Sequence, residues 1–258
     1  MTFEHILIDE TDAVATITIN RPDRLNAMSQ QTLAELTAAV DQVRDEGRMR
    51  AMILTGSGRA FCSGADLAQS LDPNDMGAGL EKGFNPLIER LRALPIPLVT
   101  AVNGAAAGGG CAYALAGDIA IAARSAYFLQ PFAAIGLTPD VGATWLLPRL
   151  VGQARAMGMM LLGERVYADQ AEQWGLIWKA VDDDQLMTEA RAVAVRLASG
   201  PTVALGLTRQ AVHQAATLSL TDTLMLERRN QRTAGRTADH REGVAAFREK
   251  RPPRFTGR

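Results

Sequence analysis

Cysteine and histidine are scarce in this chain, and their scarcity argues against several kinds of chemistry. Among 258 residues there are two cysteines, Cys62 and Cys111, and three histidines, His5, His213 and His240. The cysteines lie far apart and form no CxxC motif, which argues against a zinc site. We therefore expect no metal, no Cys/His nucleophile and a protein from a reducing compartment.

An excess of charge and long apolar runs are also missing. Lysine and arginine number 27 against 28 aspartates and glutamates, a formal net charge of -1. This balance gives no reason to expect nucleic acid or an anionic membrane as a partner. No apolar run reaches the roughly 20 residues of a membrane span, and the first ten residues lack a signal-peptide core. We expect a cytoplasmic protein with a sizeable hydrophobic core.

Short apolar segments alternate with helical ones through the first two-thirds of the chain. Segments rich in valine and isoleucine predict buried strands at 14–20, 51–56, 97–104 and 118–123. Residues 29–45 repeat apolar side chains at helical spacing, with Ser29 as the candidate N-cap. This alternation predicts an α/β fold with a largely parallel sheet and right-handed crossovers.

The later part of the chain differs in character. From about Gly152 onward, successive segments have helical composition and are separated by glycine or by Ser-Gly-Pro. A tail of this length usually packs on its own domain or on another subunit. We assign residues 1–200 to the core with the site, and residues 201–258 to a helical region for packing and oligomerisation. The polar, glycine-rich segment 69–84 is the best candidate for a mobile loop over the site.

Two glycine-rich segments, TGSGRAFCSGADL and VNGAAAGGGCAYALAGD, follow predicted strands. Glycine after a strand suggests nucleotide binding, but the known motifs fail here. The dinucleotide motif G-x-G-x-x-G has Phe61 in place of its third glycine. The second segment lacks the Gly-Lys-Ser/Thr ending of a phosphate-binding loop. The nucleophile elbow G-x-S-x-G has Phe61 and Ala65 in place of its glycines.

The remaining hypothesis is a pair of strand-to-helix turns that a substrate can approach closely. Ala65 and Gly109 are expected at or near helix N-termini, where backbone N–H groups lack partners within the helix. Two such donors that converge on one point would stabilise a developing oxyanion. The alternative is that the glycines only permit tight turns and close packing of helix on sheet.

Four segments, NRPDRLNAMS, GRAFCSGADL, AVNGAAAGGGCAYALAGDIAIAA and GLTPDVGATWLLPRLVG, together carry a more specific signal. In order and spacing they resemble the signature segments of the enoyl-CoA hydratase/isomerase (crotonase) superfamily. The resemblance implies an α/β spiral of ββα repeats with a C-terminal helical trimerisation region. It also implies an acyl-CoA substrate, no separate cofactor, and a homo-oligomer that is a trimer or a dimer of trimers.

The resemblance further implies roles for individual residues. The N–H groups of Ala65 and Gly109 correspond to the oxyanion hole for the thioester carbonyl. Contacts with CoA or the acyl group are implied for Arg24, Leu25, Ala27, Ser63, Ala65, Asp66, Leu67, Gly109 and Phe132. The alternative for Arg24 is a solvated loop charge, and Asp66 is also expected to support its turn.

Hydratases of this family use two glutamates, and this chain has neither. The first belongs three residues after the oxyanion glycine, where Ala112 stands. The second follows the proline of a QPE-like turn, where Phe132 stands. Adding water to a double bond needs one group to orient the water and a second to manage the proton at carbon 2. The two replacements therefore disfavour a simple hydratase.

Asp140 is the acid best placed to act as a base. It lies within GLTPDVGATW, and moving a double bond next to a thioester needs only one carboxylate and an oxyanion hole. Apolar walls from Phe132, Ile135, Leu137 and Trp145 would raise its pKa and make it a better base. The alternative is that Asp140 is the N-cap of the helix that follows.

Within the family, the segments around GLTPDVGATW and LERRNQRTAGRTADHREGVAAF resemble the ring-epoxide isomerases of phenylacetate degradation. This implies conversion of 1,2-epoxyphenylacetyl-CoA to oxepin-CoA, or a 3-enoyl to 2-enoyl shift, with Asp140 as the catalytic acid. Alternatives are hydration or another crotonase reaction, with water activated from segment 69–84, and a catalytically silent acyl-CoA-binding protein.

Other polar residues are expected to be structural. Asp118 starts a predicted strand and should accept hydrogen bonds, and Glu89 should lie on a solvated helix face. His213 and His240 fall in the late helices, where we expect them at the surface.

Overall fold

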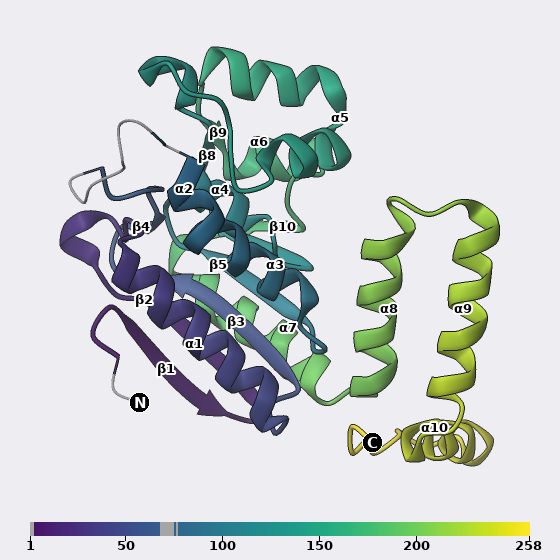
Figure 1. Ribbon diagram of the computed structural model, residues 1–258. Coiled ribbons are helices and arrows are strands. Elements are labelled where there is room, and N and C mark those ends of the chain that lie inside the picture. The colour runs from purple at the N-terminus through teal and green to yellow at the C-terminus, as the bar shows by residue number, and fades with distance from the viewer. Residues whose placement is uncertain (1–2, 68–74, 76) are drawn as a thin grey trace.

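The computed structural model describes residues 3–67, 75 and 77–258. Figure 1 shows an α/β core with a group of C-terminal helices beside it. The main sheet has the order β1-β2-β3-β5-β7-β10. Its strands are β1 (Ile6–Thr11), β2 (Val14–Ile19), β3 (Ala51–Gly56), β5 (Leu98–Val102), β7 (Ile119–Ala123) and β10 (Lys179–Val181). Only β1 and β2 pair antiparallel, so the predicted strands and the largely parallel sheet are confirmed.

A second, smaller sheet has the order β4-β6-β8-β9. Its strands are β4 (Ala60–Cys62), β6 (Ala105–Ala107), β8 (Tyr127–Leu129) and β9 (Val166–Tyr167). The first three follow β3, β5 and β7 of the main sheet after only a few residues each. Each such pair of strands leads toward helical structure, as in a repeated ββα unit. The two sheets together give the α/β architecture that the sequence predicted.

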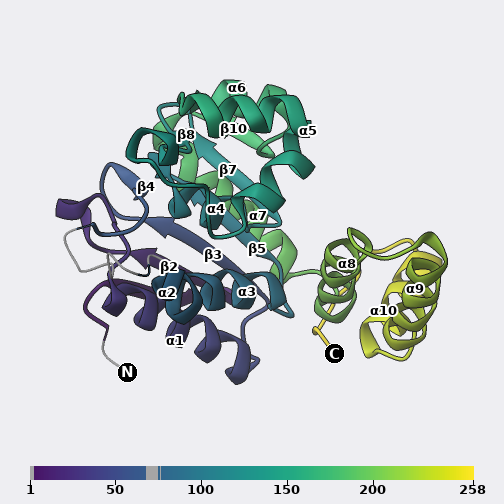
Figure 2. The same ribbon diagram turned by 45° about the horizontal axis from the view of Figure 1, so that its top comes forward.

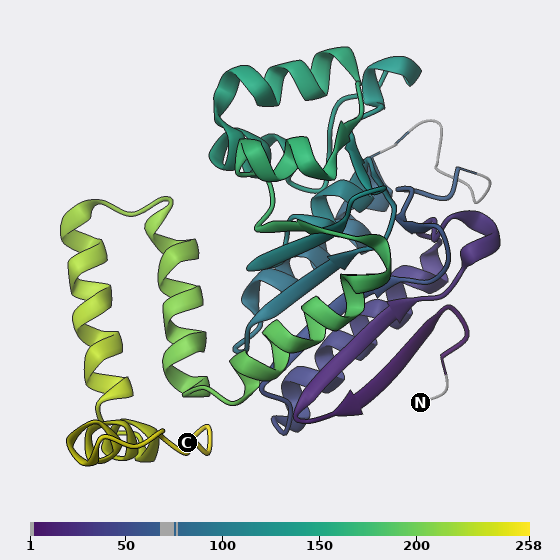
Figure 3. The same ribbon diagram turned by 180° about the vertical axis from the view of Figure 1, so that it is seen from behind.

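Helices cover both faces of the main sheet. The helices of the core are α1 (Gln30–Glu46), α2 (Gly77–Gly79), α3 (Asn85–Ala93), α4 (Gly109–Ala114), α5 (Ala143–Leu162), α6 (Ala168–Trp174) and α7 (Leu186–Ala198). In Figure 1, α1 and α3 lie in front of the sheet, and Figure 3 shows α7 on the opposite face. Ser29 caps α1 as predicted, because its side chain accepts from the Thr32 N–H at 3.1 Å.

Segment 69–84 was expected to be a loop, and this is wrong for its second half. Residues 68–74 and 76 lie outside the described residues. Residues 77–84 are helical, with α2 followed by the π-helix η2 (Leu80–Phe84). The wider turn has a local cause, since Pro86 has no N–H to donate and its ring crowds a preceding carbonyl. The Asn85 N–H instead donates back to Leu80 O in the π pattern.

A buried arginine joins the C-terminal helices to the core. These helices, α8 (Thr202–Ala215), α9 (Leu220–Ala234) and α10 (Ala238–Glu249), stand to one side of the sheets in Figures 1 and 2. Arg209 of α8 donates to the Asp118 carboxylate at 2.6 Å. It also donates to the carbonyls of Leu91, Arg92 and Leu94. Asp118 is therefore the structural acceptor that the sequence predicted, and it also accepts from the Leu98 N–H.

His213 corrects one expectation, because it is half-buried rather than a surface residue. Its Nε2 lies 3.6 Å from Asp118 Oδ1, and Nδ1 lies 3.3 Å from the Arg92 carbonyl. Burial, together with the nearby guanidinium groups, lowers the pKa of His213. His240 and Glu89 are exposed, as predicted. No helix within the described ranges combines the length and apolar character needed to cross a membrane.

Candidate active site

The two glycine-rich turns of the sequence meet in the structure. A methyl group added at Gly64 would lie 3.0 Å from the Ala107 carbonyl oxygen and 3.8 Å from Gly108 Cα. Gly64 also has a φ of 97°, which side-chain-bearing residues rarely adopt. Only glycine therefore lets the turn after β4 rest against the turn after β6, and this contact brings Ala65 and Gly109 to one region.

Both turns present backbone N–H groups without partners. Around Ala65, the Met28 N–H donates to Gly64 O at 2.8 Å and the Asp66 N–H donates to Met28 O at 3.0 Å. In this parallel bridge the Ala65 N–H faces the other way. Gly109 is the first residue of α4, where an N–H has no partner within the helix. Among the described residues neither N–H makes a hydrogen bond.

The predicted position at a helix N-terminus is confirmed for Gly109, whereas for Ala65 it stays a prediction, because residues 68–74 lie outside the described residues. Gly109 opens α4 directly after Gly108. Ala65 instead lies in an isolated bridge with Met28, and no described helix begins there. The dipole of α4 acts on the Gly109 N–H, and α4 is a short helix.

Asp140 lies in the loop between the 3-10 helix η3 (Phe132–Ile135) and α5. The alternative that it is the N-cap of α5 is wrong, since Gly142 is the N-cap and no side chain caps this helix. Only the main-chain carbonyl of Asp140 takes part, accepting from the Ala143 N–H at 2.9 Å. Val141 has a φ of 50°, which costs a β-branched residue roughly 1–3 kcal/mol, and such strain is typical of functional sites.

The Asp140 carboxylate is poorly solvated. Its Oδ1 is buried and has no hydrogen-bond partner among the described residues. Burial raises the pKa of Asp140 from 3.8 to about 6, in the direction predicted from the sequence. A carboxylate with a pKa near neutral pH and one oxygen without a partner among the described residues is suited to accept a proton.

Gly109 and Asp140 are close neighbours. A methyl group added at Gly109 would lie 3.0 Å from Val141 Cγ2, 3.7 Å from Phe84 Cδ1 and 3.8 Å from Asp140 Oδ1. The absence of a side chain at Gly109 therefore leaves the space between the unpartnered N–H and the carboxylate open. The Gly109 N–H and the Asp140 carboxylate therefore border the same space.

These groups line a cavity of about 500 Å³. Its walls come from the turn after β4, the helical segment Gly77–Asn85, the start of α4, and residues 131–142. Ser63, Asn85, Thr138 and Asp140 are the polar side chains among its lining residues. The other described residues that line it are apolar or glycine, so the cavity suits a largely apolar ligand with few polar substituents.

Ala112 and Phe132, which by resemblance correspond to the two glutamates of hydratases, differ in their surroundings. Ala112 is completely buried and does not line the cavity. Phe132 is 8% exposed and forms part of the cavity wall. Trp145, predicted as a wall of the Asp140 pocket, does not line it. Its ring stacks instead with Arg92 and Arg149, whose guanidinium carbons lie 4.8 and 4.2 Å from its centroid.

The remaining residues predicted to bind CoA fall into two groups. Ser63 and Leu67 line the cavity with Ala65, and Leu67 is exposed at its rim. Arg24, Leu25, Ala27 and Asp66 do not line it. They belong to the adjoining turn, which is tied to the site because the Ser63 N–H donates to Leu25 O at 3.1 Å.

Asp66 supports this turn as predicted. Its carboxylate pairs with Arg21 at 2.9 Å, and both side chains are largely buried. Arg21 also donates to the Ala27 carbonyl, which connects the two predicted CoA-binding segments. Arg24 is exposed at the end of the short helix η1 (Pro22–Arg24), so its guanidinium is accessible to an anion.

Three residues of the site region were missed from the sequence. Leu80 and Phe84 line the cavity from the π-helix, and Tyr113 lies buried behind it with its hydroxyl 3.0 Å from the Phe84 carbonyl oxygen. The only available signal was the tyrosine in GGGCAYA, a single polar ring among small residues. Within the described residues no group of three or more His, Cys, Asp or Glu could hold a metal ion.

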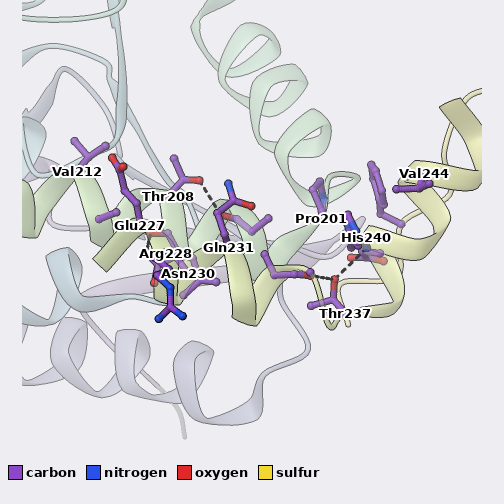
Figure 4. Close-up of a pocket in the computed structure, with 18 of the residues that line it drawn as sticks. Pro201, Thr208, Val212, Glu227, Arg228, Asn230, Gln231, Thr237, His240 and Val244 are labelled. Carbon is purple, nitrogen blue, oxygen red and sulfur yellow. Dashed lines mark hydrogen bonds between the residues drawn. The ribbon is translucent and has the colours of Figure 1, made fainter. Parts of the chain in front are cut away.

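A larger cavity of about 1070 Å³ lies among α8, α9 and α10. Figure 4 shows Val212 and Thr208 facing residues of α9, with Thr237, His240 and Val244 at its other end. It contains none of the predicted site residues.

Comparisons with known proteins identify the family and the fold. The family model described as enoyl-CoA hydratase/isomerase matches residues 9–258. The 1,2-epoxyphenylacetyl-CoA isomerase of Escherichia coli K12 is 50% identical over 260 residues, with 99% of each chain covered. A protein of Rhodobacter capsulatus called a probable enoyl-CoA hydratase is 47% identical, with both chains covered completely. The crystal structure of an enoyl-CoA hydratase from Bacillus anthracis superposes with a TM-score of 0.95 at 33% identity, covering 99% of this chain and 100% of that one.

Proposed function

Because this chain belongs to the enoyl-CoA hydratase/isomerase family, we propose that it is an acyl-CoA isomerase in which Asp140 moves the proton. The observation that carries the proposal is the Asp140 carboxylate. Among the described residues its buried Oδ1 beside Gly109 has no partner. By the family resemblance, Ala112 and Phe132 stand at the positions where hydratases carry glutamates. A site with one poorly solvated carboxylate can move a proton within a substrate, but it lacks the second acid that directs water.

The backbone N–H groups of Ala65 and Gly109 bind the thioester carbonyl oxygen in this proposal. Both are free of protein partners among the described residues, and they flank the opening between the two turns. When a proton leaves carbon 2, negative charge develops on that oxygen. Two fixed donors in a site of low polarity stabilise this charge more than they stabilise the neutral carbonyl.

Asp140 carries out the double-bond shift in two proton transfers. Its carboxylate takes a proton from carbon 2 of a 3-enoyl thioester, and the electron pair of that C–H bond delocalises into the carbonyl to give a dienolate. The protonated Asp140 then returns the proton to carbon 4, and the conjugated 2-enoyl thioester forms. No water, oxidant or reductant is consumed. The pKa of about 6 lets Asp140 serve as base and then as acid near neutral pH.

We infer the finer substrate from the relative that is 50% identical over its full length, a 1,2-epoxyphenylacetyl-CoA isomerase. Conversion of this epoxide to oxepin-CoA is also an isomerisation, so it needs no co-reactant. The cavity of about 500 Å³ is walled by Phe84 and Phe132, which suits a cyclic, unsaturated acyl group. The CoA portion then extends over the adjoining turn, past Ser63, Asp66 and Leu67 and toward the exposed Arg24.

The test compares wild type with Asp140→Asn on a 3-enoyl-CoA and on 1,2-epoxyphenylacetyl-CoA. We expect kcat to fall about 10²- to 10⁴-fold, because this is the usual contribution of a proton-transfer group. Asp184→Asn is the matched control, since Asp184 is exposed and away from the cavity. Wild-type turnover by Asp140→Asn would contradict the role of the carboxylate.

A second candidate function is hydration, favoured by the 47% identity to the Rhodobacter capsulatus protein. The missing glutamates argue against it. Rapid hydration of crotonyl-CoA by the wild type would favour this candidate. Binding of CoA esters without turnover of any enoyl or epoxide substrate would indicate a silent acyl-CoA-binding protein.

We also propose that the C-terminal helices join copies of this chain into a trimer or a dimer of trimers. Large apolar side chains are exposed on them, including Phe247 at 85%, Leu220 at 75% and Val212 at 66%. Exposed apolar surface of this kind usually marks a protein interface. Light scattering of wild type and of Phe247→Asp tests this, and a wild type that is monomeric at micromolar concentration would contradict it.

A further inference from the structure

Tyr113 is a fully buried tyrosine directly behind the candidate site. It is 1% exposed and lies on α4, one turn after Gly109. Its hydroxyl donates to the Phe84 carbonyl oxygen at 3.0 Å. A buried hydroxyl is costly unless it is hydrogen-bonded, so a phenylalanine would fit this apolar position at lower cost if the bond had no use.

The acceptor of this bond belongs to an unusual piece of backbone. Phe84 is the last residue of the π-helix η2, and both Leu80 and Phe84 line the cavity. On its other side the π-helix rests on α1, since a methyl group added at Gly83 would lie 2.9 Å from Leu33 Cδ1. π-helical turns are less stable than α-helical ones and are common at functional sites. The π-helical wall of the cavity, residues Leu80–Phe84, therefore depends on its contacts with Tyr113 and α1 for its position.

The π-helical wall and the proposed base, Asp140, both lie next to Gly109. The Phe84 ring and the Asp140 carboxylate both lie within 4 Å of a methyl group placed at Gly109. Burial, with smaller contributions from Cys62 and Asp140, raises the pKa of Tyr113 well above its ordinary value. The hydroxyl therefore keeps its proton and remains a donor to the Phe84 carbonyl across the working pH range.

From this geometry we propose that Tyr113 is a positioning residue that selects for a ring-shaped acyl group. Its hydroxyl fixes the Phe84 carbonyl and so holds the π-helical wall at a set distance from Asp140. A ring that fills the cavity contacts this wall, whereas a short linear chain leaves it largely untouched. The proposal rests on the proposed function for its substrate class, but it concerns how the acyl group is bound rather than how the proton moves.

Tyr113→Phe is the direct test, because it removes the hydroxyl and keeps the ring. Tyr127→Phe is the matched control, since Tyr127 lies on β8, away from the cavity. Calorimetry measures binding of phenylacetyl-CoA, which carries a ring, and butanoyl-CoA, which does not. Loss of one buried hydrogen bond should weaken binding of the ring ester roughly threefold to tenfold and leave the linear ester within about twofold. Hydrogen exchange should accelerate in residues 80–88.

Gly83→Ala provides a second variant should Tyr113→Phe fold poorly. Its added methyl would crowd Leu33 of α1 and so displace the π-helical wall from the other side, which should lower the selectivity for the ring ester in the same way. An unchanged ratio of ring-ester affinity to linear-ester affinity in folded variants would overturn the proposal. The ratio stays unchanged if neither affinity falls, or if both fall equally, and an equal fall indicates a general structural role. These esters carry no alkene for the enzyme to shift, so their binding is measured without any proton transfer by Asp140. Full activity of Asp140→Asn would refute the proposed function without altering this result.

Discussion

The pH dependence of turnover offers a quantitative test of Asp140 as the base. The expected change of kcat/KM with pH follows from the pKa of Asp140. Burial raises the pKa of Asp140 to about 6. At pH 7 about nine-tenths of the carboxylates are then ionised, and at pH 5 about one-tenth. An aspartate at its ordinary value of 3.8 would be almost fully ionised at both.

The direction of the change in kcat/KM follows from the role of Asp140 as a base. The base must be ionised to take the proton from carbon 2, so kcat/KM should rise with pH and level off above about 7. Between pH 5 and pH 7 the rise should be about tenfold. An aspartate with an ordinary pKa would give almost no change over this interval.

The assay follows formation of conjugated 2-enoyl-CoA by its ultraviolet absorbance between pH 4.5 and 8.5, at constant ionic strength and with a 3-enoyl-CoA substrate. Circular dichroism at each pH confirms that the protein stays folded. A profile that is flat between pH 5 and 7 would refute the reasoning. A residual activity in Asp140→Asn with the same inflection would also refute it, because another group would then be titrating.

Four further predictions concern stability and the shape of the site. Asp140→Asn should raise the free energy of unfolding at pH 7 by about 1–2 kcal/mol, a figure that allows for the partial exposure of Asp140 to water. Burial penalises only the ionised carboxylate, so the gain should vanish below pH 4, where Asp140 is protonated in both the folded and the unfolded chain. Gly109→Ala should lower kcat/KM at least about tenfold by crowding the space beside the carboxylate. The control Gly158→Ala, where the added methyl meets no described atom within 4 Å, should not. Ala112→Glu should cost several kcal/mol in urea unfolding, because it buries a charge without a partner. Arg209→Met should lower the free energy of unfolding by about 3–5 kcal/mol, because the Asp118 carboxylate loses its guanidinium partner. A change under about 1 kcal/mol would contradict the anchoring role.

The local features of the fold could be predicted from the sequence because short-range patterns determine them. β3 is buried along its whole length, and its continuous apolar run predicted this. The Ser29 cap was equally readable, since its bond spans only three residues. The π-helix η2 could not be predicted in the same way. Its composition resembles a loop, and its geometry depends on Pro86 and on packing against α1 and α4.

The site could be predicted where the type of a residue determines its chemistry. It could not be predicted where contacts between distant parts of the chain determine a residue's position or partner. Asp140 was identified as an acid in an apolar stretch, but a cap and a base have the same local sequence. What separates them is the backbone at Val141, whose φ of 50° delays the helix. His213 was misjudged for a related reason, because its partner Asp118 lies almost a hundred residues earlier in the chain. Tyr113 was missed because its acceptor, Phe84, is on a segment that appeared to be a loop.

A crystal structure with a bound, unreactive CoA thioester such as phenylacetyl-CoA tests the central claim most directly. The decisive quantity is the distance from the Asp140 carboxylate to carbon 2 of the acyl group, with the thioester oxygen at the N–H groups of Ala65 and Gly109. We expect a distance of about 3–3.5 Å, the separation of atoms poised to react. A carbonyl oxygen bound elsewhere, or a carboxylate too far to reach carbon 2 with another acid in its place, would contradict it.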